Sequence, residues 1–188
     1  GLVRPSRGLV RFHGKILHDE KDFHALRCKV GFVLQHADDQ LFFPTVLEDV
    51  AFGPLNLGFS AAEAEEQARA TLQRLGLSGF EQRLTHHLSG GEKKLVALAT
   101  VLAMEPEALL LDEPTNDLDQ DARQRLIDIL CDLPTALMVI SHDWDFLSRV
   151  CGEYRTIREG HLLACAPDVR HSHEHVHPLG LEPHWHLP

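Results

Sequence analysis

Two adjacent carboxylates, Asp112 and Glu113, are the residues whose types and spacing point most directly to chemistry. They follow the apolar run 108–111, which has no polar alternation and predicts a central strand buried on both faces of a parallel sheet. An open α/β sheet places its ligand site at the carboxyl ends of such strands. One carboxylate can hold Mg²⁺, directly or through water, while the other accepts a proton from an attacking water. This arrangement is typical of phosphoryl transfer. A strand that simply runs into an acidic turn is the alternative.

A second candidate site lies at the start of a long helical stretch, in the sequence Leu88-Ser89-Gly90-Gly91-Glu92. Ser89 and Glu92 have the spacing of a capping box, which by itself would explain those two residues. Capping does not explain two consecutive glycines in the first turn, because each costs free energy inside a helix. Gly90 and Gly91 leave room for a phosphate to meet the free N–H groups and the helix dipole, and the Ser89 hydroxyl can add a hydrogen bond. The sequence therefore predicts a phosphate contact at this helix start.

Two single residues follow other predicted strands. Gln35 comes after the strand expected at 29–34, and its amide both donates and accepts, so it can bridge a metal-bound water and a moving segment. His142 comes after the strand expected at 136–141. Taken alone, Gln35 also fits an ordinary loop residue and His142 a structural histidine.

The elements that must position these residues alternate between strands and helices, which is the pattern of an α/β fold. A helix capped by Ser60 is indicated by Glu63 three residues later. A short helix or a turn is expected at 77–84. The remaining elements are expected as strands at 9–12, 29–34, 108–111 and 136–141, helices at 21–26, 60–75, 95–104, 120–133 and 143–150, and a hairpin at 154–164.

Gly14 and Lys15 suggest a phosphate loop, but the pattern G-x-x-x-x-G-K-[ST] fails twice. Five residues separate Gly8 from Gly14, and Ile16 stands where Ser or Thr would bind Mg²⁺. A surface turn is predicted here instead.

Composition bounds the class of protein. The chain has 188 residues, 44% of them hydrophobic and 24% charged, as expected for one globular domain with a core. Its formal net charge of −10 argues against a nucleic-acid partner, since phosphate recognition leaves a basic footprint. No run approaches the ~18 apolar residues of a transmembrane helix. The four cysteines form no C-x-x-C pair and are expected to stay reduced in a cytoplasmic setting.

Three motifs, in their order and spacing, resemble the nucleotide-binding domain of ATP-binding-cassette (ABC) transporters. They are LSGGEKK at 88–94, ALLLDEPTNDLD at 108–119 and SHD at 141–143, and the resemblance covers about 1–166. The segment VLQHADDQLFFPTVLEDVAFGP at 33–54 looks like the Q-loop and docking region of energy-coupling-factor importers. Among these importers, the cobalt and nickel branch is the most similar.

The resemblance implies a role for each motif residue. Asp112 would support Mg²⁺, and Glu113 would polarise the hydrolytic water. Gln35 would contact Mg²⁺ and link it and the γ-phosphate to the transport subunit, while His142 would contact the γ-phosphate. ATP and Mg²⁺ are the implied cofactors.

The resemblance also makes a dimer part of the mechanism. Ser89, Gly90 and Gly91 would touch ATP bound to a second ABC ATPase subunit, in a homodimer or a heterodimer. Asp119 matches the D-loop aspartate that communicates across this dimer. The family often has Gly where Asp117 stands, which leaves the turn geometry open.

The implied fold is a P-loop NTPase (RecA-like) α/β core with a helical subdomain inserted at about 37–106. An integral membrane transport subunit would dock near Gln35 to Gly58, which would place the protein at the cytoplasmic face of the cell membrane. The apolar, proline-broken stretch 41–58 fits either this docking surface or a core.

The family's lysine-bearing phosphate loop and adenine-stacking aromatic residue belong before the segment with which these residues begin, so the domain is expected to be N-terminally truncated. Charge-assisted contacts to triphosphate contribute roughly 1.5–3 kcal/mol each. Losing three would cost ~5 kcal/mol or more and weaken binding by more than about a thousandfold. The 188-residue chain is therefore expected to be catalytically incompetent, although the parent family hydrolyses ATP.

The segment 167–188 differs in character and is expected to be a flexible extension. Alternate histidines on an extended segment can chelate Ni²⁺, Co²⁺, Cu²⁺ or Zn²⁺. The pattern H-E-x-x-H also occurs here, but a metalloprotease needs it on a helix in a cleft. The histidines of this segment are His171, His173, His175, His177, His184 and His186.

Three function classes remain. The chain can belong to an ATPase subunit that drives import of a transition metal. It can instead be a non-catalytic remnant that serves as a protein-docking and metal-chelating module. A soluble cassette ATPase unrelated to transport is the third, and the docking-like segment 41–58 and the acidic charge count against its DNA-repair and ribosome-bound versions.

Overall fold

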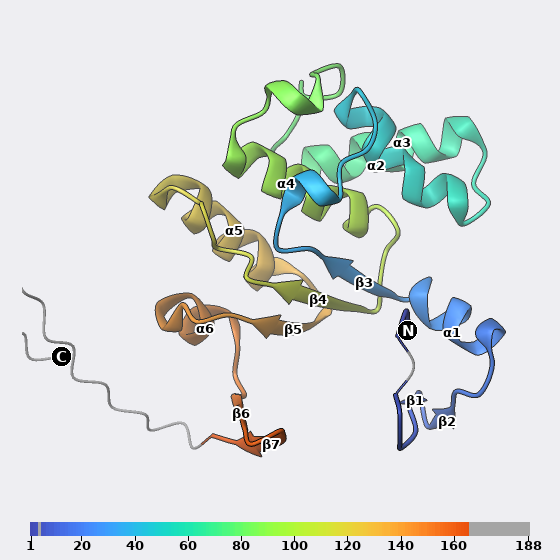
Figure 1. The fold of residues 1–188 in the computed structure, drawn as a ribbon. Coiled ribbons are helices and arrows are strands. Elements are labelled where there is room, and N and C mark those ends of the chain that lie inside the picture. The colour runs from blue at the N-terminus through green and yellow to red at the C-terminus, as the bar shows by residue number, and fades with distance from the viewer. Residues whose placement is uncertain (4, 166–188) are drawn as a thin grey trace, which may run out of the picture. The chain divides into compact units, whose positions relative to one another are not determined.

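Three parallel strands carry the candidate catalytic residues to one edge of a sheet. β3 (Val30–Val33), β4 (Ala108–Asp112) and β5 (Ala136–Ile140) pair in that order, with β4 in the centre (Figure 1). The register pairs Val33 with Leu111 of β4, and Asp112 with Ile140 of β5, so the three carboxyl ends coincide. The predicted strands and the central place of 108–111 are confirmed.

The computed structural model describes residues 1–3 and 5–165. They fall into two compact units, residues 1–151 and a second unit that begins at Gly152. The other elements of the first unit are β1 (Arg11–Phe12), β2 (Lys15–Ile16), α1 (Glu20–Arg27), α2 (Val46–Asn56), α3 (Ala61–Arg74), α4 (Gly90–Leu102), α5 (Gln120–Asp132), α6 (Trp144–Val150) and the 3-10 turns η1 (Ala37–Asp39) and η2 (Thr85–His87).

One face of the three-stranded sheet packs against helices, and Figure 1 shows α4 and α5 on this side. Gly31 is required there, because a Cβ would lie only 2.2 Å from Val101 of α4. On the opposite face, the side chains of Phe32, Met138 and Ile140 are exposed in the part of the chain that the structure describes. The prediction that β4 is buried on both faces is therefore wrong, because alternate residues of β4, Ala108, Leu110 and Asp112, are only half-buried.

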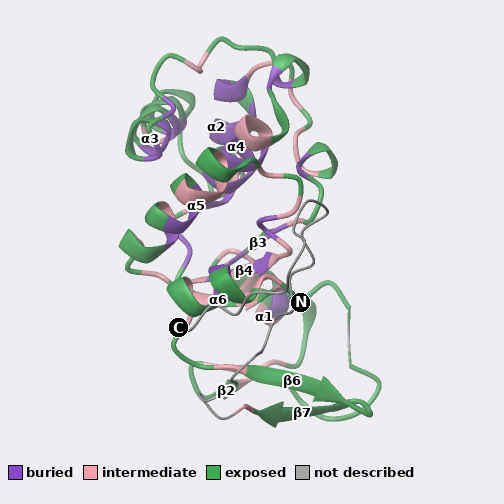
Figure 2. Ribbon diagram, turned by 90° about the vertical axis from the view of Figure 1, so that its left-hand side faces the viewer, coloured by how far each residue is buried: buried purple, intermediate pink, exposed green. Residues whose placement is uncertain are grey.

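The helices α2, α3 and α4 pack on one another and hold many of the buried residues, which are purple in Figure 2. All three begin with a capping box, at Thr45, Ser60 and Ser89, which confirms the two that the sequence indicated. α2 was not predicted, because 41–58 reads as a proline-broken stretch. Pro54 lies in the last turn of the helix, where it removes one intrahelical N–H donor, its own.

Two short hairpins complete the described chain. β1 and β2 pair around Gly14, so Gly14 and Lys15 lie at an exposed turn as predicted, and not in a phosphate loop. In the second unit, β6 (Arg155–Arg158) and β7 (His161–Ala164) pair around Glu159 and Gly160. Both turn residues have positive φ, at 52° and 78°, the geometry of a two-residue hairpin turn. No helix within the described ranges is long and apolar enough to cross a membrane.

Candidate active site at the carboxyl edge of the sheet

Glu113 is held in a fixed position immediately after β4. Its backbone N–H donates to the Ile140 carbonyl at 2.8 Å, and its φ of 44° lies in the left-handed region that a non-glycine residue rarely adopts. The carboxylate, 19% exposed, accepts a hydrogen bond from Ser141 Oγ at 3.2 Å. Its other oxygen, Oε1, lies 2.9 Å from Nδ1 of His142. The side chain is thus oriented by both residues that follow β5.

His142 is the exposed member of this pair, with 78% of its side chain accessible. The hydrogen bond to Glu113, together with the negative charge of that carboxylate, raises the pKa of the imidazole. The imidazolium therefore persists to a higher pH than for an isolated histidine. A cation at the end of β5 is suited to contacting an anionic ligand.

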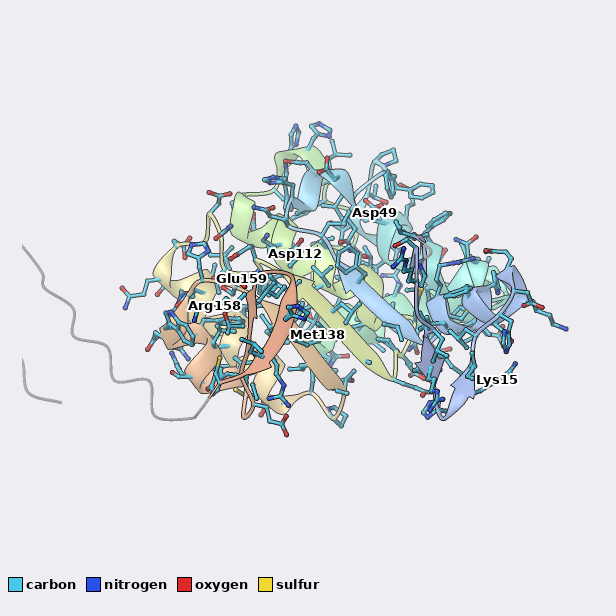
Figure 3. All side chains as sticks on the ribbon, turned by 60° about the horizontal axis from the view of Figure 1, so that its bottom comes forward. Lys15, Asp49, Asp112, Met138, Arg158 and Glu159 are labelled. Atoms are coloured by element: carbon cyan, nitrogen blue, oxygen red, sulfur yellow. The ribbon has the colours of Figure 1, made fainter. Side chains whose placement is uncertain are left out.

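Asp112 is the last residue of β4 and is half-buried (Figure 3). Its carboxylate makes no hydrogen bond within the described residues, so its oxygens are free to bind a hard cation such as Mg²⁺. Oxygen donors are what Mg²⁺ requires, and one or two carboxylates usually suffice alongside water and phosphate. The donor chemistry at Asp112 therefore fits Mg²⁺. No cluster of three or more metal-binding side chains occurs in the described part of the chain.

Gln35 follows β3 by two residues and is exposed. Its backbone carbonyl accepts a hydrogen bond from Nζ of Lys94 at 2.5 Å. Lys94 is buried, with 5% of its surface accessible, and burial lowers the pKa of its ammonium group. The negative charges of Asp117 and Asp112 oppose this lowering. Lys94 was not predicted as a site residue, although a lysine among the apolar positions of a helix is a signal that could have identified it.

The glycine pair at the start of α4 has two different explanations. A Cβ on Gly91 would lie 2.8 Å from the Cβ of Ala122, so this glycine allows α4 and α5 to approach closely. A Cβ on Gly90 would meet nothing closer than the Asp117 carbonyl at 3.9 Å, so packing does not require this glycine. Space for a ligand therefore remains an explanation for Gly90, whereas packing suffices for Gly91.

Ser89 uses both its polar groups in the cap of α4. Its hydroxyl accepts from the Glu92 N–H at 3.3 Å, and its own N–H donates to the Glu92 carboxylate at 2.8 Å. Ser89 is exposed, and its hydroxyl can still donate.

Asp119 caps α5 by accepting the Ala122 N–H at 2.8 Å. Asp117 has a φ of 62°, which favours glycine at that position.

Arg123, in the first turn of α5, binds the residue that follows His142. Its guanidinium donates to both oxygens of Asp143, at 2.9 and 3.0 Å, and to Asp145 at 2.7 Å. The Arg123 guanidinium thereby holds the pKa of the Asp143 carboxyl below its usual range. Asp143 also caps α6 through the Phe146 N–H. This link between α5 and the loop after β5 was not predicted, since nothing in the sequence pairs residues twenty positions apart.

The structure thus places Asp112, Glu113, His142 and the segment after β3 that carries Gln35 at one edge of the sheet. Ser89, Gly90 and Asp119 lie at the starts of α4 and α5. The six histidines predicted to chelate metal, at positions 171–186, fall outside the described residues.

The chain matches a family model described as ABC transporter over residues 1–116. A protein of Nitratidesulfovibrio vulgaris that carries the name of an ABC transporter ATP-binding protein is 56% identical over 186 residues, which cover 99% of this chain and 68% of the relative. The energy-coupling factor transporter ATP-binding protein EcfA of Methanothermobacter thermautotrophicus is 45% identical over 168 residues, covering 87% of this chain and 54% of EcfA.

Among solved structures, CbiO1 from Clostridium perfringens, described as part of the ABC transporter complex CbiONQ, superimposes with a TM-score of 0.78 at 34% identity. The match covers 87% of this chain and 67% of CbiO1. The chain thus spans between about half and two thirds of the length of these relatives. The chain belongs to the ABC transporter family of ATP-binding proteins, and its α/β fold is the P-loop NTPase fold of that family.

Proposed function

We propose that this chain belongs to the ATP-hydrolysing subunit of an energy-coupling-factor importer. The observation that carries the proposal is the contact of Glu113 with both Ser141 and His142, beside a half-buried Asp112 whose oxygens are free. A carboxylate oriented by two neighbours can accept a proton from water, and an imidazolium beside it can meet phosphate charge.

Each site residue receives one role in this proposal. Asp112 would hold Mg²⁺, which neutralises phosphate charge when bound. Glu113 would orient the attacking water and take its proton, and His142 would contact the γ-phosphate. Gln35 would contact the metal and sense the γ-phosphate.

The ATP site would be shared between two subunits. The 188 residues contain no phosphate-loop pattern, so we expect the chain alone to show no ATP turnover and only weak ATP binding. Ser89 and Gly90 are exposed at the start of α4, where free N–H groups can meet a phosphate. They would contact ATP that is bound to a second ABC ATPase subunit, and Asp119 would lie near the same interface between the two subunits.

Association in the presence of a nucleotide tests this proposal. The purified chain is mixed with the N. vulgaris relative, Mg²⁺ and the non-hydrolysable ATP analogue AMP-PNP, and complex formation is followed by light scattering. We expect a complex that needs the analogue and is lost in Ser89→Arg, whose long side chain would block the helix start. Association without nucleotide, or equal association of Ser89→Arg, would contradict the shared site. ATP turnover by the chain alone would overturn the expected inactivity.

A membrane partner is proposed for the surface around α2. Phe42 is 73% exposed, and Phe52 and Leu55 of α2 are 43% and 44% exposed. Asp49 (Figure 3) is 3% exposed and supports this surface, because its carboxylate accepts hydrogen bonds from the N–H groups of Phe42 and Phe43. An apolar surface this close to the Gln35 loop suits an integral membrane transport subunit, which would hold the protein at the cytoplasmic face of the cell membrane.

Cobalt or nickel is the proposed transported substrate. The likeness of 33–54 to the cobalt and nickel branch supports this choice, and so do the histidines at 171–186. The same histidines favour a second function, transition-metal chelation, which would persist in a non-catalytic docking module.

Calorimetry with Ni²⁺ tests the chelation independently of ATP. We expect micromolar or tighter binding that is lost when residues after Asp168 are deleted. Binding that is unchanged by the deletion would contradict chelation by these histidines.

A further inference from the structure

The loop from Leu34 to Gln40, called here the Gln35 loop, is fastened to α4 from both of its ends. At its start, the buried ammonium of Lys94 donates to the Gln35 carbonyl at 2.5 Å. At its end, the Gln40 amide donates to the Ala97 carbonyl at 2.6 Å and to Thr100 Oγ1 at 2.8 Å. The Gln40 side-chain oxygen accepts the Leu34 N–H at 3.1 Å, which closes the loop on itself.

Burial makes the Lys94 contact specific. An ammonium group taken out of water needs acceptors, and within the described residues the Gln35 carbonyl is its one hydrogen-bond partner. The carboxylates of Asp112 and Asp117 attract the same cation from the strand end and from the loop before α5. If the Gln35 loop moved away from α4, the Lys94 ammonium would either become exposed to solvent or stay buried without its hydrogen-bond acceptor, and both cost free energy.

A neighbouring lysine offers a contrast. Lys93 reaches the same loop, with Nζ 2.6 Å from Asp38; the Lys93 side chain is 20% exposed and the Asp38 side chain 76%. A pair in which the carboxylate is well solvated contributes little to stability. Lys93 and Lys94 thus have the same charge, lie in the same turn of α4 and contact the same loop, but Lys94 is the more deeply buried of the two.

We infer that Lys94 and Gln40 are positioning residues that make the Gln35 loop and the start of α4 move as one body. Lys94 lies only five residues after Ser89, about one and a half helical turns, so α4 is too short between them to bend. This inference rests on the proposed function, in which Gln35 serves the ATP site on this chain's side and Ser89 serves ATP on the second subunit. A displacement at one site would then be transmitted to the other through the helix.

The fastening is measured in the chain alone by hydrogen exchange of the amides at 34–41, detected by mass spectrometry of peptides. Loss of a charged hydrogen bond in Lys94→Met is expected to accelerate exchange there by at least about tenfold. Lys93→Met, the matched control, should change exchange less than about twofold. Lys94→Arg should restore most of the protection, because it returns a charged donor that a merely space-filling role would not need.

Gln40→Leu provides a second test that does not alter charge. It removes three hydrogen bonds at similar volume, and exchange at 34–41 should accelerate, whereas the control Gln67→Leu, at a half-buried position of α3 outside this loop, should leave it unchanged. Should Lys94→Met fail to fold, Lys94→Arg and Gln40→Leu still decide the matter. Wild-type exchange rates at 34–41 in Gln40→Leu, or no difference between Lys94→Met and Lys93→Met, would overturn the fastening.

The transmission is measured in the AMP-PNP complex with the N. vulgaris relative. When Ser89 and Gly90 become protected on binding, the amides at 34–41 should also slow in the wild type, but not in Lys94→Met. Absence of any complex would refute the proposed function and leave the fastening result standing. A complex in which Lys94→Met transmits protection as well as the wild type would overturn the one-body inference.

Discussion

Substituting Arg123 by Met tests whether α5 and the loop that carries His142 are joined by charge. The two hydrogen bonds from Arg123 to Asp143 join side chains that are 23% and 25% exposed, whereas the Asp145 carboxylate is 69% exposed. Two charged hydrogen bonds would contribute up to ~3–6 kcal/mol if fully shielded, and partial solvation and side-chain ordering reduce this to about 2 kcal/mol. We therefore expect Arg123→Met to lower the free energy of unfolding by about 2 kcal/mol, since Met keeps the aliphatic stem.

Urea denaturation at pH 7 measures this loss, with Arg69→Met as the control. Arg69 forms a surface pair with Glu65 at 3.7 Å, so its replacement should cost no more than about 0.5 kcal/mol. Arg123 lowers the pKa of Asp143 in the folded state, so its contribution is complete above the ordinary Asp pKa of about 4 and is lost only as the pH falls through the lowered value. The difference between wild type and Arg123→Met should hold from pH 8 to pH 5. A loss no larger than that of Arg69→Met, or a difference that disappears within this range, would refute the reasoning.

Four further substitutions have defined outcomes. Glu113→Gln should lower the pKa of His142 toward its ordinary value, because it removes the negative charge that raises it, and an NMR titration of the imidazole that shows no change would count against the pair. Gly91→Ala should destabilise the chain by about 1–3 kcal/mol in thermal or urea unfolding, since the added methyl group would overlap the Ala122 side chain in the first turn of α5. Gly90→Ala places its methyl group in open space and should be neutral or slightly stabilising. Burial raises the pKa of Asp49, so this group makes the free energy of unfolding decline as the pH rises through the window above the ordinary Asp pKa, and Asp49→Asn should flatten that decline.

The sequence predicted the elements whose signals are local. The apolar runs before Asp112 and His142 and the capping boxes at Ser60 and Ser89 identified strands and helices within a few residues. The helix α2 was missed although Thr45 and Glu48 form the same kind of box, because a proline inside the segment was weighed more heavily than the cap. Pro54 removes one N–H donor from the helix, while the Thr45 capping box and the buried side chains of α2 favour the helical conformation.

The contacts of the candidate site could not be predicted in the same way. The contact of Glu113 with His142 depends on two parallel strands being neighbours, and ligand sites of such sheets lie at the carboxyl ends of the strands. The Lys94 and Arg123 contacts instead join helices to loops that are far away in sequence. The packing of Gly91 on Ala122 shows a further limit. A glycine that admits a ligand and one that admits a neighbouring helix look the same in a sequence.

In the proposed function, the start of α4 faces ATP held by a second subunit. Hydrogen exchange of the chain in complex with the N. vulgaris relative, with Mg²⁺ and AMP-PNP, measures this directly. The prediction is that protection appears at 88–92 and at 116–119, around Ser89 and Asp119, and needs the nucleotide. Protection confined to other surfaces, such as α2, or protection at 88–92 without nucleotide, would contradict the claim.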